Sequence, residues 1–151
     1  MENLNRQLLT NGFKFNDDLK IGTKKTLSEK IVQFGEGNFL RAFVDYMFDE
    51  INEQGLFEGG ITLIQPIPGG DFLRNVLNEQ EGLYTLIARG REDGKEVAAK
   101  RLITCVNRCI NPYVDLDTYN TCAKNPELRF VVSNTTEAGI SWKEEDMITD
   151  Q

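Results

Sequence analysis

One short stretch, residues 31–43 with the sequence IVQFGEGNFLRAF, constrains the fold more than any other part of the chain. It begins as an apolar run, turns on Gly35 and Gly37, and then takes up helical spacing. The apolar side chains that this spacing places on one face of the predicted helix are Phe39, Ala42, Phe43, Tyr46, Met47 and Ile51. Glycines let the backbone approach a phosphate closely, and the first free N–H groups of the helix point at the anion. Because Leu40 replaces the third glycine of the dinucleotide fingerprint, the pattern alone leaves phosphate binding and a purely structural turn equally open.

Length and charge limit the class of protein. The chain has 151 residues, of which 40% are hydrophobic and 27% charged, as expected for one globular domain but not for two full enzyme domains. A net charge of −7 argues against nucleic acid or an anionic membrane as the main partner. It does not exclude a nucleotide held by backbone N–H groups. No apolar run approaches the roughly 18 residues of a membrane span, and the polar N-terminus is unlike a signal peptide, so we expect a cytoplasmic location.

The chain contains no histidine, which excludes histidine-based triads, imidazole bases and most zinc sites. The three cysteines, Cys105, Cys109 and Cys122, form no Cys-x-x-Cys pair. We expect them to be structural thiols and predict no metal site. No residue of this chain is assigned a catalytic role.

Strands and helices alternate along the sequence. Hydrophobic patterning predicts strands at residues 30–34, 61–65, 83–89, 95–110 and 128–133. The same criteria predict helices at residues 38–54, at 72–78 and from Asp115 or Asp117 to 124. Residues 1–30 lack sustained periodicity and are predicted to form an arm that packs on the surface.

Some elements carry more specific expectations. Asp71 is expected to cap its helix, with Phe72, Val76 and Leu77 facing inward. Residues 90–94 are predicted to form a hairpin turn that leads into a bent return strand. Residues 128–133 are predicted to form a buried strand. Arg89 and Arg101, on the hairpin, are expected on its solvated face.

This order of elements predicts an α/β fold with a mostly parallel sheet and one inserted antiparallel hairpin. Ligands of such sheets bind beyond the carboxyl ends of the strands. The loops expected there, residues 35–38, 65–70 and 134–139, are also rich in small or polar residues. Their coincidence predicts a nucleotide site.

Four ordered blocks resemble the mannitol dehydrogenase family of long-chain polyol dehydrogenases, most of all its tagaturonate reductase (altronate oxidoreductase) branch. The blocks are GEGNFLRAF at 35–43, QP at 65–66, EGLYTL at 81–86 and VSNTTE at 132–137. The resemblance covers residues 31–140. It implies a Rossmann-like, doubly wound domain at residues 31–151 that binds NAD(H), preceded by the arm at 1–30. It also implies hydride transfer between D-altronate and D-tagaturonate in hexuronate catabolism.

The resemblance further implies that a part is missing. In the family, the catalytic lysine, asparagines and histidine lie in a helical C-terminal domain that this sequence does not contain. We therefore expect an N-terminal piece of a longer oxidoreductase, inactive alone, whose sugar-acid or polyol substrate binds through the missing domain.

The residues predicted to bind the cofactor are Phe34, Gly35, Glu36, Gly37, Asn38, Phe39, Leu40, Arg41, Gln65, Asn134, Thr135, Thr136 and Glu137. Backbone N–H groups near Gly37 are expected to hold the pyrophosphate. Asn38 is equally well explained as a helix cap. Arg41 either reaches for an anion or pairs with Asp45, four residues on.

The other two loops are assigned to the riboses. Gln65 stands where nicotinamide sites usually place an acid for the adenosine ribose, and an amide can also bind a diol. No arginine is adjacent to accept the extra phosphate of NADP, so NAD is predicted. The resemblance places Thr135, Thr136 and Glu137 near the nicotinamide ribose, although turn formation and capping also explain such residues.

Three alternatives remain at this stage. The chain could belong to another polyol dehydrogenase, acting on mannitol or mannitol 1-phosphate. An S-adenosylmethionine-dependent methyltransferase also has a glycine turn, but Gln33 and Phe34 stand where its acid is expected, and Asn111-Pro112-Tyr113 lacks a second proline. In a cofactor-free interaction domain the glycines would be purely structural. Binding of NADH, compared with S-adenosylmethionine, distinguishes these classes.

Overall fold

The computed structural model describes residues 4–69 and 71–135. The strands are β1 Leu19–Ile21, β2 Glu29–Phe34, β3 Gly60–Ile64, β4 Tyr84–Glu92, β5 Lys95–Ile103, β6 Val106–Ile110 and β7 Phe130–Ser133. The helices are the 3-10 turn η1 Arg6–Leu9 and the α-helices α1 Asn38–Glu53, α2 Asp71–Glu79 and α3 Leu116–Ala123. They assemble on two sheets, a parallel one in the order β6-β3-β2-β7 and a mixed one in the order β1-β5-β4.

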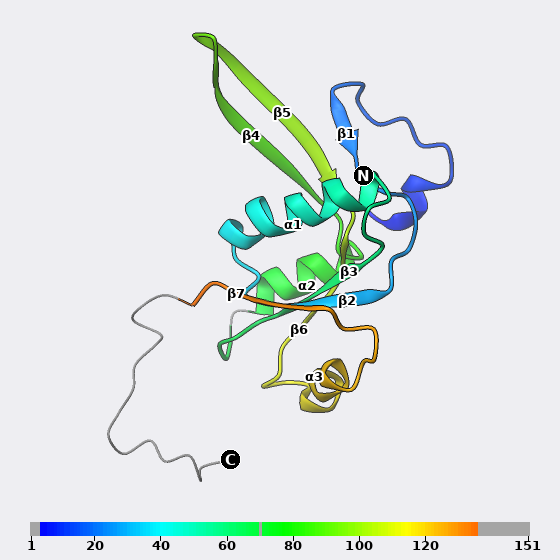
Figure 1. Cartoon of the computed structure of the whole chain (residues 1–151), viewed down its shortest axis with the longest axis vertical. Helices are drawn as coiled ribbons and strands as arrows, with labels where there is room; N and C mark the ends of the chain where they lie inside the picture. Colours follow the sequence, from blue (N-terminus) through cyan, green and yellow to red (C-terminus); the bar gives the residue numbers. More distant parts are fainter. Residues whose placement is uncertain (1–3, 70, 136–151) are drawn as a thin grey trace.

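The parallel sheet is covered on both faces, with α1 and α2 on one side and α3 on the other (Figure 1). Ile31, Ile61 and Leu63 pack beneath α1 and α2, next to Leu77. On the opposite face, Val32 and its neighbours on β3 and β6 pack against Cys122 of α3. Alternate residues of a strand point to opposite faces, which explains the two cores. The predicted α/β, Rossmann-like fold with an inserted hairpin is confirmed.

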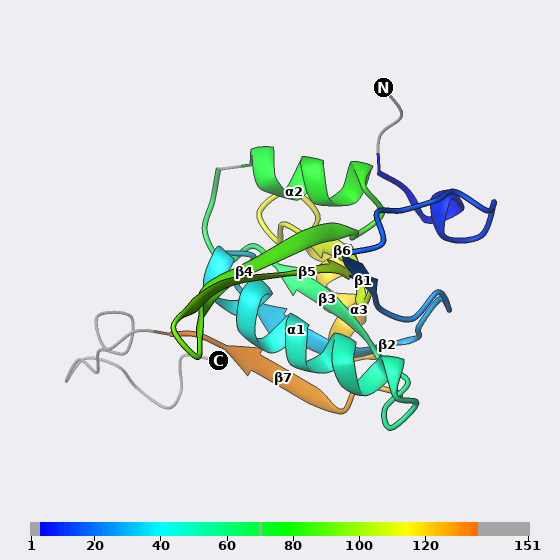
Figure 2. The same cartoon turned by 90° about the horizontal axis from the view of Figure 1, so that it is seen from above.

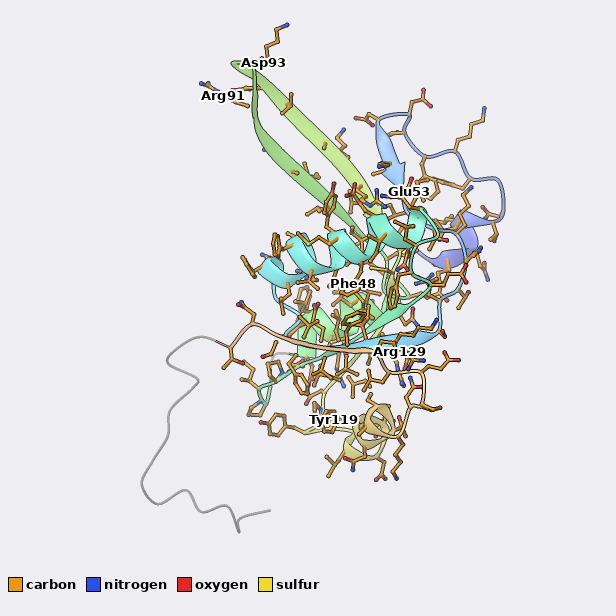
Figure 3. The ribbon with its side chains drawn as sticks, viewed as in Figure 1. Phe48, Glu53, Arg91, Asp93, Tyr119 and Arg129 are labelled. Atoms are coloured by element: carbon orange, nitrogen blue, oxygen red, sulfur yellow. The ribbon has the colours of Figure 1, made fainter. Side chains whose placement is uncertain are left out.

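The hairpin extends away from the rest of the fold, with Asp93 at its tip (Figure 3). Its ladder runs from the Tyr84–Ile103 pair to the Glu92–Lys95 pair. The turn is only Asp93 and Gly94, both with positive φ (49° and 78°), as in a type I′ turn. The predicted turn at residues 90–94 is therefore too long, because residues 90–92 remain paired.

The N-terminal arm contributes a strand to the mixed sheet. β1 pairs in parallel with β5, with Leu19 opposite Lys100. Seen from above, β1 lies beside the base of the hairpin (Figure 2). Leu9 of η1 is buried with Leu83 and Leu102. The arm thus packs on the hairpin sheet, and β2 already begins at Glu29.

The predicted strand at residues 95–110 is two strands, which belong to different sheets. The chain leaves β5 after Ile103 and enters β6 at Val106. At this crossing the backbone N–H groups of Thr104 and Cys105 donate to Oδ1 of Asp49 on α1, at 2.7 and 3.0 Å. The carboxylate replaces the acceptors that a continuous ladder would have supplied, since buried N–H groups need a partner.

Helix α1 buries three polar side chains. Its buried side chains are Leu40, Asp45, Asp49 and Asn52. On the predicted apolar face, Phe39 and Phe43 are 62% and 51% exposed. Asp49 and Asn52 can be buried because each is hydrogen-bonded, Asp49 at the sheet crossing and Asn52 to Gly59, the residue before β3.

The expectation that Arg101 is solvated is wrong. Its side chain is 4% exposed, and its Nε donates to Oδ2 of Asp49 at 2.7 Å. A second nitrogen, Nη2, donates to Glu53 at 2.8 Å. Arg101 lies on the face of β5 that α1 covers, and its ion pair with Asp49 is therefore in the protein interior. Arg89, farther along the hairpin, is exposed as expected.

Two predicted burials also fail. Phe72, at the start of α2, is 81% exposed, whereas Leu77 of the same helix is buried. Among the described residues β7 pairs with β2 alone and lies at the edge of the sheet, and its Phe130 and Val131 are 47% and 63% exposed. Residues 128–133 are therefore not a buried strand. No helix in the described ranges has the length and apolar character needed to cross a membrane.

Candidate functional site

The three predicted loops meet at one hollow of about 610 Å³, at the carboxyl ends of β2, β3 and β7. Its lining is Phe34, Gly35, Gly37, Phe39, Leu40, Pro66, Ile67, Ser133, Asn134 and Thr135. Seven of these residues belong to the predicted set, while Pro66, Ile67 and Ser133 were not predicted as site residues. Their positions in the sequence could have identified them, because Pro66 and Ile67 directly follow a predicted strand and Ser133 is the last residue of another.

Other predicted residues lie around the hollow or outside the described residues. Of the described residues, Glu36, Asn38, Arg41 and Gln65 do not line it. Thr136 and Glu137 lie outside the described residues. A larger open hollow of about 780 Å³ lies on the exposed hairpin, away from the strand ends.

The glycine turn has the geometry of an anion cradle. Gly35 has φ +116°, a conformation that favours glycine, and its N–H donates to the carbonyl of Ile64 at 2.9 Å. A Cβ added at Gly37 would meet no described atom within 4 Å, so the hollow reaches the backbone there. Arg41 N–H donates to the carbonyl of Gly37 at 3.3 Å, at the start of α1. The N–H groups of residues 38–40, between Gly37 and Arg41, have no acceptor within the helix and are available to an anion.

The side chain of Arg41 stabilises the glycine turn through hydrogen bonds. Its Nε donates to the carbonyl of Glu36 at 2.8 Å, and its Nη2 donates to Oδ1 of Asn38 at 2.6 Å. Asn38 is the first helical residue, after the Gly37 cap position, and is therefore not the helix cap. Among the described residues Arg41 forms no ion pair with Asp45, and its guanidinium lies 5.2 Å from the ring centre of Tyr84. Its positive charge thus stays beside the turn.

A buried carboxyl lies beneath the first turns of α1. Asp45 is fully buried, and the hydroxyl of Tyr84 donates to its Oδ2 at 2.8 Å. The same hydroxyl lies 2.9 Å from the carbonyl oxygen of Arg41. Burial raises the pKa of Asp45 to about 7, against the opposing hydrogen bond from Tyr84. Asp45 therefore titrates near neutral pH, one helical turn after Arg41.

Gln65 is turned away from the hollow. Its side chain is 1% exposed, and its Nε2 donates to the carbonyls of Ile67, at 3.1 Å, and Gly69. The amide group that was predicted to bind a ribose is thus already bonded to its own loop. Gln33 is placed in the same way at the end of β2, with its Nε2 3.2 Å from the carbonyl of Gly35.

The third loop presents hydroxyl groups. Oγ of Ser133 and Oγ1 of Thr135 are 2.6 Å apart, and both residues are exposed. Asn134 follows β7 directly and is also exposed. These groups can exchange hydrogen bonds with the hydroxyls of a bound sugar, because each hydroxyl both donates and accepts.

Comparison with known proteins decides the family. The pattern of the mannitol dehydrogenase Rossmann domain matches residues 29–149. The chain belongs to the mannitol dehydrogenase family. The match begins at β2 and includes all three loops of the hollow, as the four sequence blocks indicated.

Altronate oxidoreductases are among the proteins that this chain resembles in sequence. The enzyme of Yersinia enterocolitica is 51% identical over 123 residues, and that of Bacillus subtilis is 44% identical over 123 residues. These matches cover 81% and 82% of this chain but 25% of each relative. The chain therefore spans about a quarter of the length of the relatives that it matches.

Two solved structures show the same fold. Pseudomonas fluorescens mannitol 2-dehydrogenase superposes with a TM-score of 0.73 at 23% identity, over 87% of this chain and 26% of that one. A D-sorbitol dehydrogenase gives 0.75 at 20% identity, over 90% and 28%. The Pseudomonas enzyme was solved as a ternary complex with NAD and D-mannitol, and NAD is the cofactor that the sequence predicts here.

Two further expectations concern chemistry. The described part of the chain holds no group of three acidic, cysteine or histidine side chains that could bind a metal. The three cysteines are free and buried, and burial raises the pKa of the Cys109 thiol to about 12. Thiols in this state are unreactive, which agrees with a structural role.

Proposed function

We propose that this chain is the NAD(H)-binding domain of an oxidoreductase that interconverts D-altronate and D-tagaturonate. The observation that carries the proposal is the hollow at the ends of β2, β3 and β7, into which the glycine turn opens. The substrate assignment is supported by the 51% identity to an altronate oxidoreductase. In this proposal residues 31–151 form the binding domain and residues 1–30 its arm.

The residues present fit a dinucleotide. Backbone N–H groups at the start of α1 would hold the diphosphate, and the open position at Gly37 leaves room for it. Arg41 adds a positive charge beside the turn. Hydroxyl and amide groups after β7 would bind the ribose of the nicotinamide half. Bound NAD supplies the hydride acceptor for oxidation of a secondary alcohol.

The sugar-acid substrate is proposed to bind mainly through a further domain, since relatives are about four times as long as the matched region. Phe39, which lines the hollow, and Phe43, one helical turn later on α1, are both exposed. A further domain would cover these two side chains. The hydride acceptor would then react in a site from which water is excluded. We expect the isolated chain to bind cofactor without turning over substrate.

Titration with NADH, followed by fluorescence or calorimetry, tests the binding function, with S-adenosylmethionine as the control ligand. Gly37→Val should abolish NADH binding without unfolding the chain, because the side chain would fill the open space at the turn. Gly90→Val is the matched control. Gly90 also has open space around its Cβ position and no positive φ, but it lies on the hairpin.

The two variants give opposite expected results. Gly90→Val should bind NADH like the wild type. If Gly37→Val also keeps wild-type affinity, the glycine turn is not the cofactor site. The proposal would be refuted if the wild-type chain bound S-adenosylmethionine but showed no binding of NADH at millimolar concentration.

A further inference from the structure

Two glutamines are buried near the ends of β2 and β3, next to the loops that line the hollow. Gln33 lies on β2, two residues before Gly35, and Gln65 follows β3 directly. Their side chains are 0% and 1% exposed. Each amide nitrogen donates to carbonyl groups of the loop that follows its own strand. The two loops are the two that carry Gly35, Gly37, Pro66 and Ile67 into the lining of the hollow.

These bonds fix the direction of the loop carbonyls. The carbonyl oxygen of Gly35 faces Gln33 at 3.2 Å, and those of Ile67 and Gly69 converge on Gln65. Because both amides are buried, carbonyls that bond to them point into the protein and away from the hollow. In the glycine turn, Arg41 engages the next two carbonyls, those of Glu36 and Gly37.

The arrangement is costly for packing, so it calls for an explanation. The side-chain oxygens Oε1 of Gln33 and Gln65 are buried and have no hydrogen-bond partner among the described residues. A buried acceptor without a partner destabilises a fold, and an apolar side chain of the same size would avoid that penalty. Gln33 also hydrogen-bonds the carboxyl of Asp45, which lowers the pKa of that group. A benefit at the loops would account for both glutamines.

We infer that Gln33 and Gln65 are positioning residues that turn the carbonyl oxygens of both loops away from a bound diphosphate. The inference rests on the proposed cofactor-binding function. A carbonyl oxygen carries partial negative charge and therefore repels a phosphate. The N–H groups of a turn attract the phosphate instead. Holding the carbonyls inward before binding spares the ligand the cost of reorganising the loops.

The role differs from the direct ribose contact predicted for Gln65. A ribose-binding amide would discriminate between ligands by their sugar hydroxyls. A residue that orients loop carbonyls instead affects every ligand that carries a diphosphate and has little influence on an uncharged nucleoside. This difference supplies the test.

Gln33→Met and Gln65→Met remove the amide donors while keeping side-chain length. Each variant should bind NADH and ADP about tenfold more weakly than the wild type, and bind adenosine about equally well. Adenosine binding is measured by ligand-detected NMR, because it is weak. The matched control is Asn52→Met, which removes a buried amide that bonds to Gly59, far from the hollow. It should lower the thermal midpoint yet keep NADH affinity within about twofold.

Each outcome has one meaning. If the wild type binds NADH and the two glutamine variants bind it equally well, the positioning role is wrong and the proposed function stands. If adenosine affinity falls as much as ADP affinity, the glutamines merely support the fold. If the wild type does not bind NADH, the proposed function fails and the inference fails with it.

A measurement on the wild-type chain covers the case in which the variants do not fold. The side-chain amide protons of Gln33 and Gln65 should exchange slowly with solvent and show through-bond couplings to the carbonyl carbons of residues 35, 67 and 69. Rapid exchange of either amide would overturn the inference.

Discussion

Replacing Asp45 with asparagine should make the chain more stable at alkaline pH. Asp45 is fully buried on α1, and burial raises its pKa from 3.8 to about 7. An acid whose pKa is higher in the folded state binds its proton more tightly there than in the unfolded chain. Its contribution to stability is therefore complete below the unfolded pKa and is lost as the pH rises through the folded pKa.

The size of the effect follows from these values. A rise of about three pKa units corresponds to about 4 kcal/mol over the whole titration. Between about pH 5 and pH 8 the wild type should lose about 2.5 kcal/mol of unfolding free energy through this one group. Asparagine has nearly the same shape, can still accept the hydrogen bond from Tyr84, and does not ionise.

Urea unfolding of both proteins across this pH range measures the difference. All other titrating groups are shared, so the gap between the two curves isolates Asp45. A control that leaves Asp45 in place is Tyr84→Phe, which removes the hydrogen bond that lowers the pKa of Asp45 and should move the midpoint to higher pH. Parallel curves for the wild type and Asp45→Asn would refute the reasoning, because they would show that Asp45 does not titrate in this range.

Two further predictions concern the sheet crossing. Arg101→Met should lower the unfolding free energy by about 4 kcal/mol, because it leaves the carboxylate of Asp49 buried without its 2.7 Å partner; a loss below about 1 kcal/mol in urea unfolding would contradict the ion pair's role. Gly22→Ala should lower the unfolding free energy by about 2 kcal/mol. The methyl group of the alanine would lie 2.6 Å from Oγ1 of Thr104 and closer still to the carboxylate of Asp49. Gly90→Ala, with open space around it, is the control and should change stability little.

Local sequence patterns predicted the part of the fold that carries the hollow. Strand β2, the glycine turn and α1 were recognisable because glycine conformation and apolar spacing act over a few residues. The meeting of three loops followed from the rule that parallel strands present their carboxyl ends at one edge. The same rule could have selected Pro66, Ile67 and Ser133 as lining residues.

The errors arose where partners lie far apart in sequence. Asp49 has the pattern of a surface acid on a helix, and only its contacts with Arg101 and Thr104, more than 50 residues away, explain its burial. The break between β5 and β6 depends on the same carboxylate. β7 has the composition of a buried strand, but its exposure is set by the order of strands in the sheet.

The carboxylate at the crossing has a consequence for how the fold opens. The mixed sheet and the parallel sheet are joined in sequence at Thr104 and Cys105, and both N–H groups bond to Asp49. Arg101 ties the same side chain to β5. Backbone protons of α1, of β6 and of the inner end of β5 next to Arg101 should therefore exchange with solvent at similar rates, as one cooperative unit. The outer half of the hairpin, beyond this joint, should exchange faster and open on its own.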